Sequence, residues 1–297
     1  MNNINVALVQ QKLHADYQTN LDFAIAEIKS AAKNGAQLVV LCELHSCLYF
    51  CQEKSTHYFS LAQTIPGPLT QMLSSAASEN KVVLVGSVFE KRAEGLYHNT
   101  AVVFENNGDL AGMYRKMHIP DDPGYHEKYY FALGDLGFTP IQTSLGKLGV
   151  MICWDQWFPE GARLMALAGA QVLIFPTAIG WDPRDDNNEQ QRQCQAWQVI
   201  QQGHSIANNI PLMCVNRIGL EKNLSNKTAG INFWGQSFVT DAMGKITAMA
   251  SCEKEETLFA TINLSETEQI RQIWPYLRDR RVDAYFNIDK RFIDESV

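Results

Sequence analysis

Short runs of apolar residues recur along the chain, and they predict the strands of a sheet-based fold. Several of these runs are nearly continuous in Val, Ile and Leu, which is typical of strands buried on both faces. We expect strands at residues 6–9, 38–42, 82–88, 100–104, 148–153, 172–175, 212–215, 237–240 and 259–262.

Segments between these runs have apolar residues at helical spacing. In the first, Leu21, Ile25 and Ile28 form one stripe, and Gly35 stands where a helix end favours glycine. Two further helices are expected over residues 161–168, ending at Gly169, and over about residues 188–208.

Turn-forming residues separate the predicted elements. Pro66-Gly67-Pro68 precedes a helix, and Asn106–Asp109 and Asp241–Lys245 each indicate a hairpin. A strand, a helix and a strand follow one another over 4–42 and again over 148–176, which suggests two similar halves. Helices that alternate with strands indicate a layered α/β fold. We expect residues 1–297 to form a single domain.

Composition narrows the class of protein. The chain has 297 residues, 46% of them hydrophobic, which is enough for a sizeable core. Its 25 basic and 32 acidic residues give a net charge of −7, which argues against a nucleic-acid partner and is compatible with a small cationic substrate. The first residues do not form a secretory signal, and no apolar stretch is long enough to cross a membrane. We therefore expect a soluble, cytoplasmic protein without a membrane partner.

The cysteines do not form a pattern typical of disulfides or metal sites. Their number is odd, and the chain is neither small nor visibly secreted, so a disulfide framework is not expected. Cys42, Cys47 and Cys51 are close in sequence but lack the spacing of a zinc site, so no metal is expected. The seven cysteines are at positions 42, 47, 51, 153, 194, 214 and 252.

Three apolar strands are each followed by a residue that can take part in catalysis. Glu43, Lys116 and Cys153 stand at these strand ends. Ligand sites of open α/β sheets gather at the carboxyl ends of strands, so we expect the three side chains to meet in one crevice. Each residue taken alone is more often a structural or surface residue.

Together, the three residue types suit nucleophilic catalysis on a carbonyl carbon. A thiolate is a strong nucleophile, and a nearby carboxylate can take the thiol proton and return it to a leaving amine. A lysine ammonium can lower the pKa of the thiol and stabilise an oxyanion, together with the backbone N–H of Trp154. This chemistry requires no cofactor.

Three sequence blocks around these residues resemble a known family. Glu43 after its strand, the run Tyr114-Arg-Lys-Met-His-Ile-Pro120 and the run Ile152-Cys-Trp-Asp-Gln-Trp-Phe-Pro-Glu160 look like the signatures of the nitrilase superfamily of carbon–nitrogen hydrolases. The similarity extends over nearly the whole chain, including Gly169–Thr177. The resemblance implies a four-layer α-β-β-α sandwich.

The resemblance also implies roles for individual residues. Glu43 is expected to be the general base, Lys116 the oxyanion stabiliser and Cys153 the nucleophile. Glu127 falls where the family often has a second glutamate, which would orient Lys116 and the substrate; otherwise it would be a surface charge. Family members commonly form homo-oligomers, and the C-terminal segment, about 265–297, is expected to extend onto a neighbouring subunit.

The substrate is expected to be a small carbamoylated amine. The run Asp121–Phe131 and the run Cys153–Arg163 resemble the N-carbamoylputrescine amidohydrolase branch. This implies hydrolysis of N-carbamoylputrescine to putrescine, carbon dioxide and ammonia, a step from agmatine to polyamines. The distal ammonium needs acidic or aromatic neighbours. The candidates are Asp121, Asp122, Tyr49, Asp155, Trp154 and Trp157.

Several alternatives remain open. Asp121-Asp122-Pro-Gly is also an ordinary turn sequence, and Asp155 can instead bond backbone next to the nucleophile. A loop with Arg184 can either cover the pocket or face solvent. Rival functions are an amidase for carbamoyl amino acids of the β-ureidopropionase or N-carbamoyl-D-amino-acid type, an ω-amidase or nitrilase, and a non-catalytic binding protein.

Residues at a subunit contact are a further open question. Trp197, Val199 and Trp234 are candidates either for such a contact or for the core. The basic C-terminal run with Arg278, Arg280 and Arg281 can wrap onto a neighbour or remain in solvent.

Overall fold

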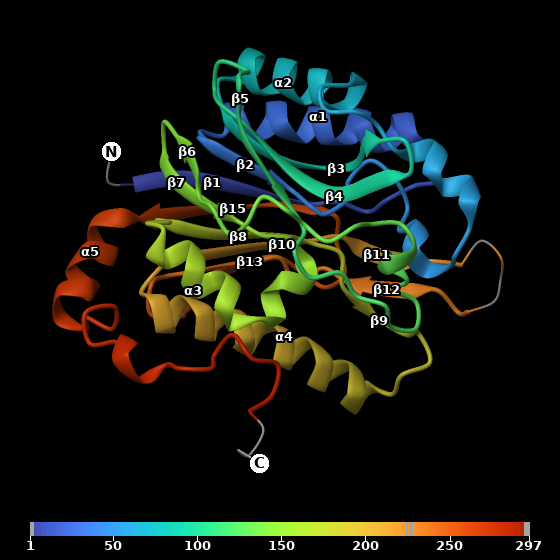
Figure 1. Cartoon of the computed structure of the whole chain (residues 1–297). Coiled ribbons are helices and arrows are strands. Elements are labelled where there is room, and N and C mark those ends of the chain that lie inside the picture. Colours follow the sequence, from blue (N-terminus) through green and yellow to red (C-terminus); the bar gives the residue numbers. More distant parts are fainter. Residues whose placement is uncertain (1–2, 224, 226–227, 294–297) are drawn as a thin grey trace.

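Two six-stranded β-sheets pack face to face, and helices cover the outer face of each (Figure 1). The computed structural model describes residues 3–223, 225 and 228–293. The predicted four-layer α-β-β-α sandwich is confirmed by this arrangement.

The first sheet is built mostly from the N-terminal half of the chain, with one strand from near the C-terminus at its edge. Its strand order is β15-β1-β2-β3-β4-β5, and β2 pairs in parallel with both β1 and β3. The strands are β1 (Asn3–Gln10), β2 (Leu38–Leu41), β3 (Val83–Ala93), β4 (Leu96–Phe104), β5 (Leu110–Arg115) and β15 (Glu256–Asn263).

The second sheet has the order β14-β13-β10-β8-β7-β6, with β7, β8 and β10 parallel to one another. Its strands are β6 (Ile141–Thr143), β7 (Gly146–Val150), β8 (Val172–Thr177), β10 (Leu212–Asn216), β13 (Phe238–Thr240) and β14 (Ile246–Met249). A small third sheet has the order β11-β12-β9, formed by β11 (Ile218–Glu221), β12 (Ile231–Trp234) and β9 (Gly180–Trp181).

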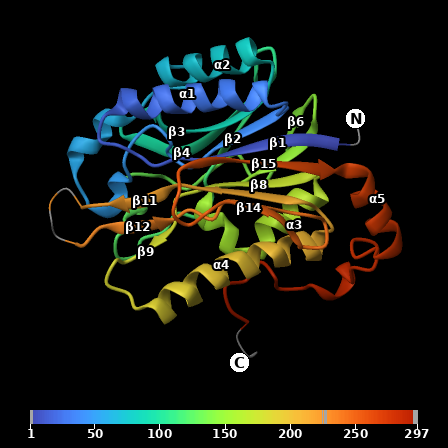
Figure 2. The ribbon, with the colours of Figure 1, turned by 180° about the vertical axis from the view of Figure 1, so that it is seen from behind.

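The helices lie on opposite outer faces of the sandwich. On the first sheet lie α1 (Tyr17–Lys33) and α2 (Pro68–Asn80), and on the second lie α3 (Pro159–Leu167) and α4 (Asn187–Asn208) (Figures 1 and 2). Helix α5 (Leu264–Ile273) lies at one end of the sandwich. Short 3₁₀ turns occur at η1 (Phe50–Gln52), η2 (Thr56–Leu61), η3 (Glu127–Tyr129), η4 (Cys153–Trp157) and η5 (Val282–Ala284).

Successive side chains of the central strands enter different apolar layers, because they point to opposite faces of a strand. In β2, Leu38 and Val40 pack between the two sheets, whereas Val39 and Leu41 pack against α1 and α2. This explains why the strand is continuously apolar in sequence rather than alternating with polar residues.

The predicted elements match the structure in most places. The two strand–helix–strand units exist, since β1 is parallel to β2 and β7 is parallel to β8, and both predicted hairpins form. The strand expected over 148–153 is shorter, because β7 ends at Val150 and Cys153 begins a 3₁₀ turn. The short strands β6, β9, β11 and β12 were not predicted, since two to four residues carry little periodic signal.

Two of the residues left open as contact candidates prove to be core residues. Trp197 is fully buried, and Trp234 is 2% exposed, whereas Val199 is exposed on α4. In the C-terminal segment, Arg280 and Tyr285 border a hollow against α3 and α4 of the same chain. No helix within the described residues is both long and apolar enough to cross a bilayer.

Candidate active site

Glu43 lies two residues beyond the end of β2 and is fully buried. Its Oε1 accepts hydrogen bonds from the Asn99 side chain at 2.7 Å and from Lys116 Nζ at 2.8 Å. Its Oε2 has no hydrogen-bond partner among the described residues. A buried carboxylate oxygen without a partner is costly, and it is suited to receive a proton from a substrate, a water or a thiol.

Lys116 follows β5 directly, and two carboxylates share its ammonium. Besides Glu43, its Nζ donates to Glu127 at 2.7 and 2.9 Å. Glu127 begins η3 and also accepts a 2.7 Å hydrogen bond from the Tyr49 hydroxyl. Because all four side chains are buried, the cluster is held by short hydrogen bonds in a region of low dielectric.

Cys153 lies three residues beyond the end of β7, at the first position of η4. Its φ of 42° lies in the left-handed region, which non-glycine residues rarely adopt and which is often found at functional sites. Its Sγ is 3.7 Å from the carbonyl oxygen of Ala178. The sharp turn therefore presents the sulfur of a buried residue at the strand end.

Burial and neighbouring charges set the protonation of this cluster. Burial raises the pKa of Cys153 well above its usual range, and Glu43 adds to this while Lys116 opposes it. Burial also disfavours the Lys116 charge, but Glu127 and Glu43 outweigh that effect and raise the lysine pKa. The resting thiol is thus protonated at neutral pH and needs a base in order to attack.

The second glutamate titrates differently from an ordinary carboxyl group. Burial raises the pKa of Glu127 from 4.5 to about 7, although the Lys116 ammonium opposes this shift. In such a cluster the thiol can attack a carbonyl carbon once the base has taken its proton, and the ammonium can stabilise the resulting oxyanion.

A cavity of about 360 Å³ gives access to this cluster. Cys153 and Glu127 border it, and so do Asp122 and Arg192, which bring one charge of each sign. Its apolar walls come from Tyr125, Trp154, Trp157, Ile179 and Trp234. The remaining bordering residues are Pro120, Pro123, Ala178, Gly180, Gln193 and Ala196.

Three of the six predicted substrate contacts border this cavity: Trp154, Trp157 and Asp122. Asp121 does not, although it is the next residue in the chain. Its carboxylate is directed to His126 at 3.2 Å and to Lys54 at 3.9 Å. The two adjacent aspartates thus differ in position, and only Asp122 can meet a ligand in the cavity.

Tyr49 and Asp155, also predicted to contact the substrate, do not border this cavity. Tyr49 is 1% exposed, and its hydroxyl is used by Glu127 rather than facing the cavity. Asp155 is fully buried and accepts hydrogen bonds from the Tyr114 hydroxyl at 2.8 Å and from the backbone N–H groups of Ile152 and His118 at 3.0 and 2.9 Å. Asp155 therefore fixes the turn that carries the nucleophile, as the backbone-bonding alternative had it.

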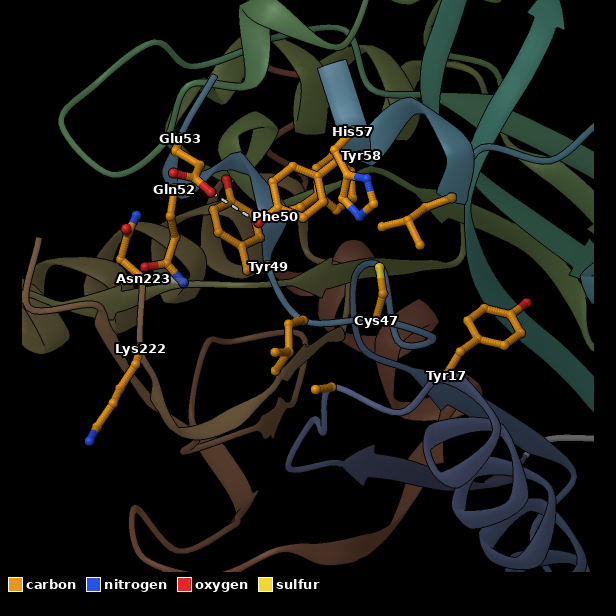
Figure 3. A pocket seen from close by; sticks show the side chains of 13 residues that line it. Tyr17, Cys47, Tyr49, Phe50, Gln52, Glu53, His57, Tyr58, Lys222 and Asn223 are labelled. Atoms are coloured by element: carbon orange, nitrogen blue, oxygen red, sulfur yellow. Dashed lines mark hydrogen bonds between the residues drawn. The ribbon is translucent and has the colours of Figure 1, made fainter. Parts of the chain in front are cut away.

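A second cavity, of about 200 Å³, is bordered by Tyr49 and neighbouring residues (Figure 3). Cys47, Phe50, His57 and Tyr58 also border it, whereas Glu43, Lys116 and Cys153 do not. It is therefore distinct from the cavity at Cys153.

Several residues at the site carried no recognisable signal in the sequence. Asn99 lies inside a strand, and Arg192 looks like a solvent-facing residue of a helix. No residue of the loop 182–186 borders the cavity. Arg184 pairs with Asp182, and Asp186 caps α4.

Comparisons with known proteins agree with this geometry. A sequence model described as carbon–nitrogen hydrolase matches residues 5–272. A citrullinase from Francisella tularensis is 41% identical over 98% of this chain and 100% of its own length, and an N-carbamoylputrescine amidase from Solanum lycopersicum is 41% identical over 95% and 93%. The crystal structure of a carbon–nitrogen hydrolase from Helicobacter pylori G27 is 49% identical, covers 98% of this chain and 100% of that one, and has a TM-score of 0.96.

Proposed function

The chain belongs to the carbon–nitrogen hydrolase family, and on this premise we propose that it hydrolyses N-carbamoylputrescine to putrescine, carbon dioxide and ammonia. The reaction would serve putrescine formation from agmatine. One observation carries the proposal: Cys153 and Glu127, which is bonded to Lys116, share a cavity with the carboxylate of Asp122. The relatives named as N-carbamoylputrescine amidases support the same substrate.

In the first half of the proposed reaction, Glu43 takes the proton of the Cys153 thiol as the sulfur bonds to the carbamoyl carbon. Lys116 and the N–H of Trp154 stabilise the negative oxygen. The bond from carbon to the alkyl nitrogen then breaks, and Glu43 returns the proton so that putrescine leaves as the amine. A carbamoyl-thioester remains on Cys153.

In the second half, Glu43 takes a proton from water, and the water oxygen bonds to the thioester carbon. The carbon–sulfur bond breaks, and the proton returns to the sulfur. The product is carbamic acid, which decomposes to carbon dioxide and ammonia. The unpartnered Oε2 of Glu43 supports its use in both halves, because the same oxygen can bond first to the thiol and then to water.

The chemistry of the cavity supports an alkyl chain ending in a charge. Tyr125, Trp154, Trp157 and Trp234 offer apolar surface to the four methylenes of the putrescine chain. The Asp122 carboxylate would pair with the distal ammonium, which would otherwise be left without a counter-charge.

Citrulline is a second candidate substrate, and Arg192 is the observation that favours it. Citrulline carries the same terminal ureido group but ends in both an ammonium and a carboxylate. Arg192 borders the cavity together with Asp122, so the two side chains bring a positive and a negative charge to it, although Glu189 accepts hydrogen bonds from Nε and Nη2 of Arg192. The Francisella citrullinase supports this alternative.

A comparison of substrates tests the proposal. Release of ammonia would be measured with N-carbamoylputrescine, citrulline and N-carbamoyl-β-alanine, with Cys153→Ala as the control for background hydrolysis. The highest kcat/KM for N-carbamoylputrescine supports the main proposal, and the highest for citrulline supports the second. Preference for N-carbamoyl-β-alanine, or hydrolysis of ω-amides alone, would overturn both.

We also propose that the chain acts as a homo-oligomer. Large apolar side chains are exposed on α3 and α4 and again along the C-terminal segment. Such surface is usually covered by a partner. They are Leu164, Leu167, Val199, Ile206, Trp274, Val282, Phe286, Ile288 and Phe292. Mass measurement by light scattering tests this, and a monomer at micromolar concentration would contradict it.

A further inference from the structure

Arg217 lies just after β10 of the second sheet, yet it bonds to the segment that carries the base from the first sheet. Its side chain is fully buried. Nη2 donates to the carbonyl oxygen of Glu43 at 2.6 Å and to that of Leu44 at 3.1 Å. Nη1 donates to the carbonyl oxygen of Cys47 at 3.2 Å. One guanidinium therefore binds three carbonyl groups of the turn that follows β2.

Glu221 completes this arrangement from β11. It accepts a 2.9 Å hydrogen bond from Arg217 Nη1, and its other oxygen accepts the backbone N–H of Tyr49 at 2.6 Å. Arg217 and Glu221 thus hold the segment 43–49 at both of its ends. The rings of Tyr49 and Phe233 lie 5.8 and 5.2 Å from the guanidinium carbon.

The contact between Arg217 and the Glu43 segment bears on the distance between the base and the nucleophile. Glu43 and Cys153 arise from different sheets, and the transfer of a proton between them depends on the distance that separates their side chains. Leu44, next to Glu43, has a φ of 49°, a strained conformation that persists only where surrounding bonds impose it. Arg217 contributes to that constraint through its bonds to the carbonyl groups of Glu43 and Leu44, and Ser87 Oγ accepts the Leu44 N–H at 2.9 Å.

We propose that the Arg217–Glu221 pair is a positioning pair for catalysis: it ties the Glu43 segment to the second sheet and so fixes the base relative to the Cys153 sulfur. Only a planar guanidinium can serve several carbonyl groups and a carboxylate at once in this way. The segment it holds includes Cys47 and Tyr49, which border the cavity of Figure 3, and Lys222, the residue after Glu221, borders the same cavity. The inference rests on the proposed nucleophile and base, but not on the identity of the amine.

Two variants at Arg217 separate charge from geometry. Arg217→Lys keeps the charge opposite Glu221 but loses the fork, and Arg217→Met keeps much of the volume without charge. We expect kcat to fall about 100-fold in Arg217→Met, the loss that a displacement of about 1 Å can cause, with KM changed less than about threefold. The kcat of Arg217→Lys should lie between that of Arg217→Met and that of the wild type.

A reaction that needs no substrate supplies the second readout. The rate of Cys153 alkylation by iodoacetamide, mapped by peptide mass spectrometry because six other cysteines are present, depends on how readily Glu43 takes the thiol proton. We expect this rate to fall in parallel with kcat. Glu221→Gln keeps an acceptor for the Tyr49 N–H but removes the charge, and it should give a smaller loss of both rates.

Ile28→Ala is the matched control for loss of stability alone. Ile28 is fully buried between α1 and the first sheet, and its truncation should lower the unfolding free energy by about 2–5 kcal/mol without changing kcat or alkylation. All rates would be measured at a temperature where circular dichroism shows each variant folded. If Arg217→Met does not fold, Arg217→Lys and Glu221→Gln carry the test.

The outcomes are distinguishable. Wild-type kcat and alkylation in folded Arg217→Lys and Glu221→Gln would overturn the positioning role and leave the proposed function intact. Suppose instead that the variants lose alkylation and that the wild-type protein hydrolyses no ureido compound. This result would support the positioning role and refute the proposed function.

Discussion

The hydroxyl of Tyr49 donates a 2.7 Å hydrogen bond to the carboxylate of Glu127, the same carboxylate that accepts from Lys116. Tyr49 therefore acts on the lysine through an intermediate glutamate and does not face the cavity at Cys153. Removing this hydroxyl tests whether the orientation of Glu127 matters for the reaction.

We predict that Tyr49→Phe lowers kcat by about tenfold, because a hydrogen bond to a charged group contributes about 1.5–3 kcal/mol, with little change in KM. Steady-state kinetics with the preferred ureido substrate provide the measurement. Tyr58→Phe, which loses a hydroxyl bonded to Glu53 away from the cluster, is the control. Equal kinetics for Tyr49→Phe and wild type would show that Glu127 needs no such support.

Cys153→Ala should abolish turnover, with a loss on the order of 10⁴-fold or more, and leave the fold intact. The reason is that no other described thiol borders the cavity. Activity and the thermal unfolding midpoint would be measured together, and Cys194→Ala is the control because Cys194 lies on α4 away from the cavity. Near-normal turnover in Cys153→Ala would remove the nucleophile from the mechanism.

The raised pKa of Glu127, about 7, predicts an acid limb in the pH profile. As the pH falls through 7, Glu127 takes up a proton and loses the negative charge that holds Lys116, so kcat/KM should decline. The limb reports the interacting pair of Glu127 and Lys116 rather than one residue. Glu127→Gln should lower the rate and shift or flatten this limb, and an unchanged limb in that variant would contradict the assignment.

The raised pKa of Glu127 affects the free energy of unfolding in the opposite direction to its effect on kcat/KM. The folded chain binds this proton more tightly than the unfolded chain, so the contribution of Glu127 is greatest at acid pH and is lost as the pH rises from 4.5 to about 7. Unfolding by urea across this range should show a smaller fall in Glu127→Gln than in wild type.

Adjacent aspartates offer a matched pair for substrate recognition. Asp122→Asn should raise KM for N-carbamoylputrescine about tenfold, because Asp122 borders the cavity and would lose its charge pair with the ammonium. Asp121→Asn should leave KM unchanged, since Asp121 bonds to His126 outside the cavity. If both variants gave the same KM, the distal amine would have to be recognised elsewhere.

Asp155→Ala should lower the unfolding free energy by about 3 kcal/mol, because it leaves the Tyr114 hydroxyl and two backbone N–H groups without their buried acceptor. Denaturation by urea measures this. Asp22→Ala on the surface of α1 is the control and should change the value by less than about 0.5 kcal/mol. If Asp155→Ala changed the unfolding free energy as little as Asp22→Ala does, Asp155 would again be a candidate for substrate contact.

Local sequence determined most of the architecture. The apolar runs that became β2, β3 and β8 and the stripe of α1 are set by the direction in which successive side chains point, and this depends only on spacing. The resemblance around Glu43, Lys116 and Cys153 could also be seen without coordinates.

Tertiary structure decided what those residues meet. Asp121 and Asp122 are adjacent and identical in type, so the sequence does not show that only Asp122 borders the cavity. Successive residues of a turn direct their side chains differently, and this direction is known only from the structure. Arg217, 174 residues from Glu43 in the chain, became a neighbour of the base only when the two sheets packed together. Contacts of this kind depend on how distant segments cross, and no periodic pattern in the sequence encodes that crossing.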